Sequence, residues 1–211
     1  MKKIIGFLTA VLALCSFGAK AETFNLKYSS NYLMPAYIHF QESGSSYAVN
    51  AQINIPLYHI RFVASGSKAN QTFNMYDYRD IRNDKVYAQA KISAGKIEYG
   101  KIKTGLESEK LTLPTFDLFT MAFQLTYFDR LPTSFQITNG KKLYPMENVA
   151  VNKSEKNINV NGTNVTEITY RFKTGNKDIT VKKYAGEHFP RFIAYNRDGD
   201  EYELTFSEFV R

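Results

Sequence analysis

The alternation of apolar and polar residues at every second position is the feature of this sequence that most constrains its fold. In residues 47–55, apolar side chains are separated by Asn50, Gln52 and Asn54. A β-strand places successive side chains on opposite faces, so such a segment has one apolar face and one solvated face. The same period is found in residues 58–64, 86–92 and 168–172. We therefore expect a mainly β protein with about ten to twelve antiparallel strands.

Short turn signals separate these segments. Asn-Gly and Asp-Gly pairs supply the positive φ angles that tight hairpins need. They occur at Asn139-Gly140, Asn161-Gly162 and Asp198-Gly199. Residues 22–211 contain no linker, low-complexity stretch or internal repeat. The sequence therefore predicts one antiparallel meander that forms a single domain.

Residues 113–131 depart from the two-residue period and predict a helix. Pro114 stands near the start, where helices tolerate proline, and a second proline follows the segment. Apolar residues surround most of this helix, so other parts of the protein have to cover it. The fold class that we expect is a single, strongly curved antiparallel sheet or open barrel with one apolar helix across or inside it.

Charged residues flank the predicted helix. Asp117 falls in its first turn and Arg130 in its last turn, where each complements the helix dipole. A second interpretation applies if the helix is a lid: these residues, with Asp129, then latch it to the rim of the sheet. Both interpretations place the charges at the two ends of the helix.

The first 21 residues have the layout of a cleavable export signal. Lys2 and Lys3 precede an apolar run over residues 4–17, and small residues precede a cleavage site after Ala21. The run is shorter than the roughly 20 apolar residues that a membrane-spanning helix needs. We expect a mature protein, residues 22–211, in the periplasm and without a transmembrane segment.

Cys15 raises the alternative of a lipoprotein signal. That signal requires a small residue before the cysteine, and Leu14 is too large. Cleavage after Ala21 is therefore favoured. It leaves a mature chain without cysteine, which excludes disulfides and thiolate chemistry.

The charge of the mature chain argues against nucleic acid as a partner. Removing Lys2, Lys3 and Lys20 from the 27 basic residues leaves 24 against 20 acidic ones, a net charge of +4. Nucleic-acid binding needs clustered Lys and Arg, whereas here they are spread along the chain. The small excess is compatible with a partner at an anionic membrane surface or with an envelope polysaccharide.

The sequence offers few candidates for catalysis. The histidines lack the spacing of metal ligands, and P-loop, dinucleotide-binding and nucleophile-elbow motifs are absent. We therefore expect no metal and no cofactor, and we assign no catalytic residue. The histidines are His39, His59 and His188.

One short segment combines acidic, aromatic and basic residues. Residues 76–82 contain Asp77, Asp80 and Arg82 together with two tyrosines and a second arginine. Carboxyl groups beside aromatic rings are the chemistry of glycoside binding or hydrolysis. The alternative is a polar connection whose charges pair with one another. The candidates for a polar site are Asp77, Asp80, Arg82, Asp117 and Arg130.

Apolar residues of the predicted helix are the candidates for a ligand cleft. A curved sheet rich in Phe and Tyr and closed by an apolar helix can hold an apolar ligand. We name Phe116, Phe119, Met121 and Phe123 as its lining. If these side chains only fill the core, replacing Phe119 by alanine costs about 3–5 kcal/mol. We expect instead that this variant loses ligand retention and little stability.

A series of short motifs follows along the chain. They are Ser65-Gly66, Tyr78 and Arg82, then Leu113-Pro114, Asp117, Tyr127 and Arg130 around the apolar helix, then Phe189-Pro190, Asp198-Gly199 and Leu204. In this order they resemble a family of exported bacterial proteins known as domain of unknown function 3108. Asn74-Met75 differ from the Gly-Leu-Pro-like stretch common in that family.

The resemblance implies a secreted or periplasmic β-rich domain of unsettled function and supplies no catalytic residues. The expected domain is also similar, in fold only, to half-barrel carriers that shuttle lipoproteins across the periplasm. We therefore expect a non-catalytic binding or carrier module for a lipid or another apolar envelope ligand. The alternatives are a glycan-acting envelope enzyme that uses acidic residues and a structural component of an envelope assembly. The few catalytic candidates favour the first.

Overall fold

Most of the described chain forms one large antiparallel sheet. The computed structural model describes residues 21–32, 34–197 and 200–211, so residues 1–20 of the predicted signal peptide lie outside it. Within the described residues the sheet has 13 strands in the order β12-β13-β14-β15-β16-β1-β2-β3-β4-β5-β6-β7-β8. β12 and β8 are its two edges, so the sheet is open. The predicted mainly β class and the open, curved sheet are confirmed.

The large sheet consists of two meanders. The first contains β1 (Glu22–Ser30), β2 (Ala36–Ser43), β3 (Ser46–Ile55), β4 (Tyr58–Ala69), β5 (Thr72–Arg82), β6 (Lys85–Ser93), β7 (Lys96–Lys101) and β8 (Gly105–Lys110). The second contains β12 (Asn152–Val160), β13 (Thr163–Thr174), β14 (Lys177–Tyr184), β15 (Phe192–Arg197) and β16 (Asp200–Phe209). They join because β1 pairs with β16 as well as with β2.

A small second sheet precedes and follows the helix. Its strands are β9 (Thr115–Phe116), β10 (Phe135–Thr138) and β11 (Leu143–Met146). β9 and β10 are parallel, and β10 and β11 are antiparallel. The expectation of one meander is therefore too simple, and the described residues form more strands than the ten to twelve expected.

The sequence signals for strands and turns are found where expected. In β2 the residues Ala36, Ile38 and Phe40 are buried, and the residues between them face outward. Asn161-Gly162 forms the β12–β13 turn with φ angles of 50° and 84°. Gly140 has a φ of 77° in the β10–β11 connection. The predicted turn at Asp198-Gly199 lies outside the described residues.

The helix α1 (Leu118–Phe128) is shorter than the predicted one. Asp117 is its N-cap and accepts hydrogen bonds from the backbone N–H groups of Phe119 and Thr120, at 2.9 and 3.2 Å. The residues before Asp117 pair with β10, so Phe116 lies in a strand. Asp129 adopts left-handed backbone geometry, with a φ of 58°, and ends the helix.

The prediction that Arg130 lies in the last turn of the helix is therefore wrong: Arg130 lies beyond the helix. The reason is that the left-handed Asp129 turns the chain away from the helix axis before Arg130. Asp117 does lie at the positive end of the helix dipole, as its N-cap.

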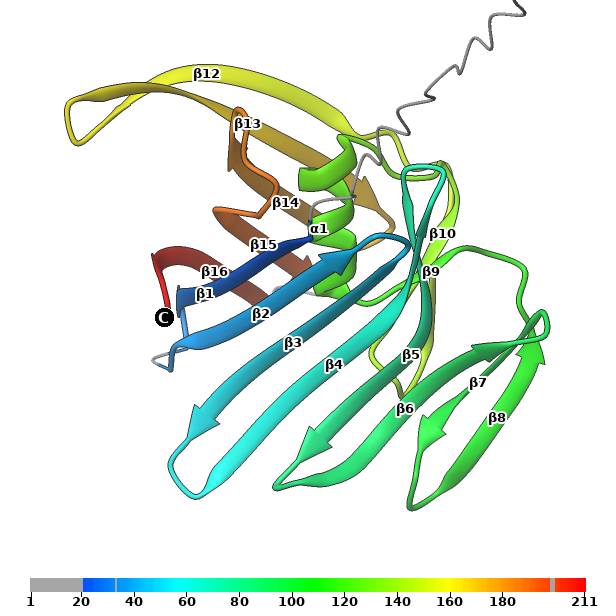
Figure 1. Cartoon of the computed structure of the whole chain (residues 1–211). Helices are drawn as coiled ribbons and strands as arrows, with labels where there is room; N and C mark the ends of the chain where they lie inside the picture. Colours follow the sequence, from blue (N-terminus) through cyan, green and yellow to red (C-terminus); the bar gives the residue numbers. More distant parts are fainter. Residues whose placement is uncertain (1–20, 33, 198–199) are drawn as a thin grey trace, which may run out of the picture.

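The core lies between α1 and the inner face of the curved sheet. Figure 1 shows α1 between the two arms of the sheet. The helix is buried over residues 119–126, and it contacts β3, β5 and β14, which belong to both meanders. The apolar helix is thus covered on all sides, as its composition requires.

Candidate functional site

A continuous row of phenylalanine rings connects the helix with the protein surface. On α1, the ring of Phe123 stacks on Phe40 with 4.1 Å between centroids. Phe40 lies 6.0 Å from Phe24, and Phe24 lies 5.4 Å from Phe189. Phe189 contacts two rings of β16, at 5.1 and 5.2 Å. We call these residues the aromatic track: Phe123, Phe40, Phe24, Phe189, Phe206 and Phe209.

The outer end of the aromatic track is open to solvent. Phe209 is 57% exposed, whereas Phe40 and Phe123 are fully buried. A β-bulge brings Phe206 and Phe209 to the same face, because Phe206 pairs with Tyr28 and Phe209 with Leu26. The track therefore runs from solvent to the buried side of the helix.

A cation lies over the rings near this open end. The guanidinium carbon of Arg191 is 4.4 Å from the ring centroid of Phe206 and 5.0 Å from that of Phe189. Glu187 pairs with this guanidinium at 2.5 Å. Hydrogen bonding to Glu187 raises the pKa of Arg191, so the arginine stays charged at the mouth of the track.

Polar contacts fix the C-terminal end of α1 to the second meander. Lys183 of β14 donates to the backbone oxygen of Thr126 at 2.6 Å and pairs with Asp129 at 2.9 Å. The hydroxyl of Tyr170 also donates to Asp129. Burial acts to raise the pKa of Asp129, but the hydrogen bonds from Tyr170 and Lys183 outweigh it and lower this pKa below its usual range.

Similar contacts fix this end of α1 to the first meander. The hydroxyl of Tyr127 donates to Glu42 at 3.0 Å, and Arg130 donates to the backbone oxygen of Asn70 at 2.7 Å. We call the contacts on both sides the latch. Its members are Thr126, Tyr127, Asp129, Arg130, Glu42, Asn70, Tyr170 and Lys183. Asp129 thus connects the helix to β13 and β14, and Arg130 connects it to the β4–β5 turn.

The four residues named as a ligand lining are all buried against protein. Phe116 is fully buried and lies 5.7 Å from the ring of Phe135. Met121 and Phe123 are likewise fully buried, and Phe119 is 8% exposed, with its ring 6.1 Å from that of Phe62. Phe123 belongs to the aromatic track. Phe116 lies apart from the other three in the small sheet.

The predicted polar site is not assembled as one cluster. Asp77 and Asp80 lie on strand β5, three residues apart, and so point to opposite faces of the sheet. Asp77 pairs with Arg79 at 3.1 Å. Asp80 accepts two hydrogen bonds from Arg82, at 3.0 and 3.1 Å. The charges pair with one another as in the alternative interpretation, although on a strand and not in a connection.

The other two polar candidates lie at opposite ends of α1. Asp117 is the N-cap and Arg130 follows the C-terminus. Among the described residues, groups of three or more His, Cys, Asp or Glu side chains that could hold a metal ion are absent. In the same part of the chain, the helix is too short to cross a membrane.

Several residues of the track and the latch escape prediction from sequence. Phe24, Phe206 and Phe209 lie on strands at the two ends of the chain, and Lys183 is a lysine in an otherwise ordinary strand. The signals available in the sequence are an excess of aromatic residues near the C-terminus and the family motif Phe189-Pro190. Comparison with known proteins adds nothing to this: no family model, curated protein or solved structure matches the chain.

Proposed function

We propose that this protein is a non-catalytic binding or carrier module of the periplasm whose ligand is a lipid or another apolar envelope molecule. The aromatic track is the observation that carries the proposal. A row of apolar side chains that begins in solvent and continues beneath a helix suits an apolar ligand once the helix opens. Arg191 and its partner Glu187 lie over the mouth, where the polar head group of a ligand can contact them.

In this proposal α1 is a lid that the latch holds closed. Asp129 is 49% exposed, so water solvates its carboxylate when the latch opens. The ring contacts beneath the helix are non-directional, and an acyl chain replaces them without leaving polar groups unpaired. Opening at the C-terminal end of α1 therefore gives the ligand access along the track.

The proposed location depends on the export signal. β1 begins at Glu22, the first residue after the proposed cleavage site. Cleavage there leaves this central strand complete. The alternative of a glycan-acting enzyme has less support than the carrier, because Asp77 and Asp80 face opposite sides of the sheet and do not form one site.

Loosening the latch tests the proposal. Lys183→Met removes the contacts to Thr126 and Asp129. Lys182→Met leaves both in place and removes an ion pair with Glu167 and a cation–π contact with Phe192 on the opposite face of β14. We expect Lys183→Met to take up a fluorescent fatty acid several-fold faster than the parent in stopped-flow measurements, and Lys182→Met to match the parent. Equal rates in all three proteins would contradict a lid.

The mouth of the track provides a second test. Phe209→Ser changes an exposed ring and so costs little stability, but it should weaken fatty-acid binding. Tyr202→Ser is the matched control, because Tyr202 is 48% exposed and lies outside the track. Native mass spectrometry of protein purified from its own envelope should show bound lipid. Absence of lipid there and of fatty-acid binding in the parent protein would reject the carrier function.

The variant Phe119→Ala distinguishes a helix that acts as a lid from a helix that only fills the core. Phe119 is the least buried of the four lining residues, so we expect its truncation to reduce ligand retention with a smaller loss of stability than Phe123→Ala. For Phe123, stacked on Phe40, the usual cost of about 3–5 kcal/mol applies. A strongly lowered melting temperature of Phe119→Ala, with no lipid binding by the parent protein, would show that the helix only fills the core.

A further inference from the structure

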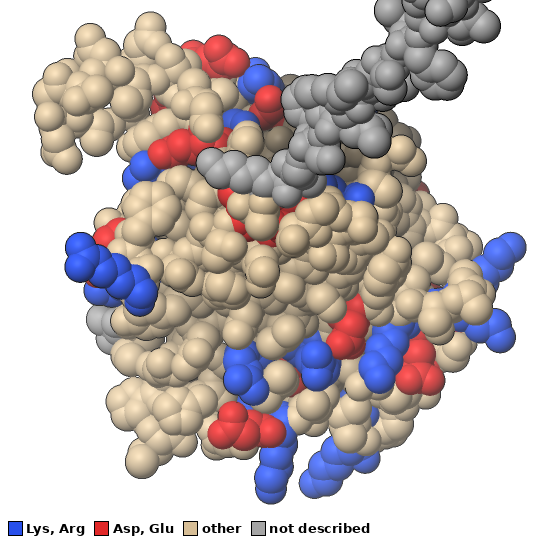
Figure 2. Space-filling model, viewed as in Figure 1, with Lys and Arg blue, Asp and Glu red and all other residues tan. Residues whose placement is uncertain are grey.

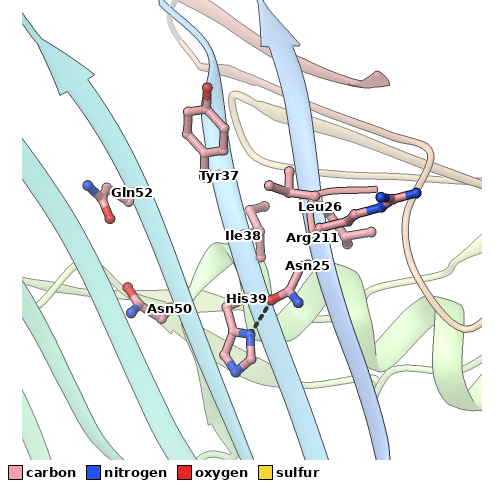
Figure 3. A pocket seen from close by; sticks show the side chains of 9 residues that line it. Asn25, Leu26, Tyr37, Ile38, His39, Asn50, Gln52 and Arg211 are labelled. Carbon is pink, nitrogen blue, oxygen red and sulfur yellow. Dashed lines mark hydrogen bonds between the residues drawn. The ribbon is translucent and has the colours of Figure 1, made fainter. Parts of the chain in front are cut away.

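The outer face of the sheet carries a groove with both polar and apolar lining that the lid and the aromatic track do not use. Two shallow pockets, of about 210 and 240 Å³, lie side by side on this face and share Gln52. The first is shown in Figure 3. Together they cross strands β1 to β5. We call them the outer groove, and its polar lining is Asn25, Tyr37, His39, Asn50, Gln52, His59, Arg61, Asp84 and Arg211.

The strand alternation places this groove on the side away from α1. Leu26, Ile38 and Ala51 are buried in the core that contains the helix. Their neighbours in sequence, among them Asn25 and His39, therefore point to the other face. Ligand in the outer groove would be separated from the aromatic track by the thickness of the sheet.

Neutral hydrogen-bonding groups dominate the middle of the groove. Asn50 and Gln52 each carry an amide that both donates and accepts, and His39 adds an imidazole. Nδ1 of His39 lies 2.6 Å from Oδ1 of Asn25, as drawn in Figure 3, and Gln52 donates to Asn54 at 2.7 Å. These contacts fix the side chains in place and leave further donors and acceptors free.

Two polar atoms of the lining are unsatisfied. Oδ1 of Asn50 and Nε of Arg61 are buried and have no hydrogen-bond partner among the described residues. A buried polar atom without a partner costs free energy, so a ligand that supplies one gains it. The terminal torsion of an Asn side chain is broad, so a small rotation presents the amide of Asn50 to the groove.

The charge of this region favours an uncharged ligand. Figure 2 shows few charged side chains in the middle of the molecule, over β2 and β3, and more of them below this area and at the margins. The charged side chains of the groove lie at its two ends: Arg211 at one, and Arg61, 3.9 Å from Asp84, at the other. Sugar hydroxyls donate and accept as the amides do, and the half-buried ring of Tyr37 offers a flat apolar surface to a sugar.

From this geometry we propose that the outer groove binds an uncharged glycan chain across strands β1 to β5. The length of the groove suits an extended chain rather than a single sugar. The site is independent of the proposed function, because it lies on the opposite face of the sheet. Its occupation would hold the protein on a polysaccharide while the inner face remains available.

The test is an NMR titration of the full mature protein with chitohexaose and with isomaltohexaose. We expect amide shifts of Asn25, His39, Asn50 and Gln52 with at least one of these glycans. Gln52→Ala should weaken that binding about tenfold, since it removes the amide shared by both pockets. Gln89→Ala should bind as the parent does, because this amide on β6 lies outside the groove.

Three outcomes of the glycan titrations would overturn the proposal. They are the absence of shifts with both glycans, shifts confined to residues outside the groove, and unchanged affinity of Gln52→Ala. Equal or tighter binding of a Gly-Ser peptide in the groove would also overturn it, in favour of a polypeptide. If Gln52→Ala fails to fold, His39→Ala replaces it, because His39 is exposed and contributes little to the core. A failure of this test leaves the fatty-acid experiments unaffected.

Discussion

Asp117 determines where the helix starts, although the surrounding apolar pattern extends further. Its side chain accepts hydrogen bonds from two backbone N–H groups and from the hydroxyl of Thr120. The carboxyl group is buried, and burial raises its pKa despite these hydrogen bonds. One residue thus combines a cap that stabilises the helix with a charge that the core disfavours.

Substitution of Asp117 separates these two effects. Asp117→Ala should reduce the free energy of unfolding by about 1–2 kcal/mol, because the cap is lost. Asp117→Asn retains an oxygen acceptor and should cost less. Urea denaturation at several pH values measures both.

The pH dependence follows from the raised pKa. The folded state holds the proton of Asp117 more tightly than the unfolded state does. The stability gained from protonated Asp117 is therefore fully present below the usual aspartate pKa of about 3.9. It is lost from the free energy of unfolding as the pH rises through the raised pKa of the folded state. Asp117→Asn should remove this part of the pH dependence, and an unchanged profile would show that Asp117 does not cause it.

At the scale of elements, irregularities in the strands shape the sheet. A bulge lies between Ser65 and Gly66 where β4 pairs with β5, and others interrupt the β5–β6 and β1–β16 pairs. At Gly66 a Cβ atom would lie 1.9 Å from the backbone oxygen of Asn74. The close approach of the two strands at this bulge therefore requires glycine.

Gly66→Ala tests this requirement. The clash is with backbone atoms, so the strands have to separate, and we expect a loss of about 1–3 kcal/mol or more. Ser65→Ala, next to it in the same strand, should have little effect. Equal stability of the two variants in thermal melts would show that the bulge tolerates a side chain.

The whole molecule is held together by the pairing of its first and last strands. β1 pairs with β2 on one side and with β16 on the other. The buried cluster includes Tyr28, Phe73 and Tyr170, from the centre and from both meanders, and α1 packs against both. The two meanders therefore share one core.

We expect the mature protein to unfold in a single cooperative transition. Far-UV circular dichroism, which follows the strands, and near-UV circular dichroism, which follows tyrosine packing, should give coincident urea curves. Two separated transitions would show that the meanders unfold independently. The far-UV spectrum itself should be mostly strand with a minor helical part.

Export is a further prediction for the whole chain. Protein recovered from the periplasmic fraction should begin at Glu22, which is the first residue of β1. Intact-mass analysis measures this directly. A mass that corresponds to an acylated Cys15 would mean that the chain is a lipoprotein.

Features that depend on neighbouring residues were determined by the sequence alone. The alternation in residues 47–55 and 168–172 predicts strands β3 and β13, because side-chain direction in a strand depends only on position. Asn161-Gly162 predicts a turn, since its backbone preferences are local. The apolar segment after Asp117 predicts a buried helix, although its start was placed too early.

Features that depend on distant residues were decided only by the tertiary structure. The aromatic track combines Phe24, Phe40, Phe123, Phe189, Phe206 and Phe209, and the bulge in the β1–β16 pair brings Phe206 and Phe209 to the same face. Lys183 becomes part of the latch only because β14 passes the end of α1. Such contacts arise from long-range strand pairing and packing, which no local period or turn preference specifies.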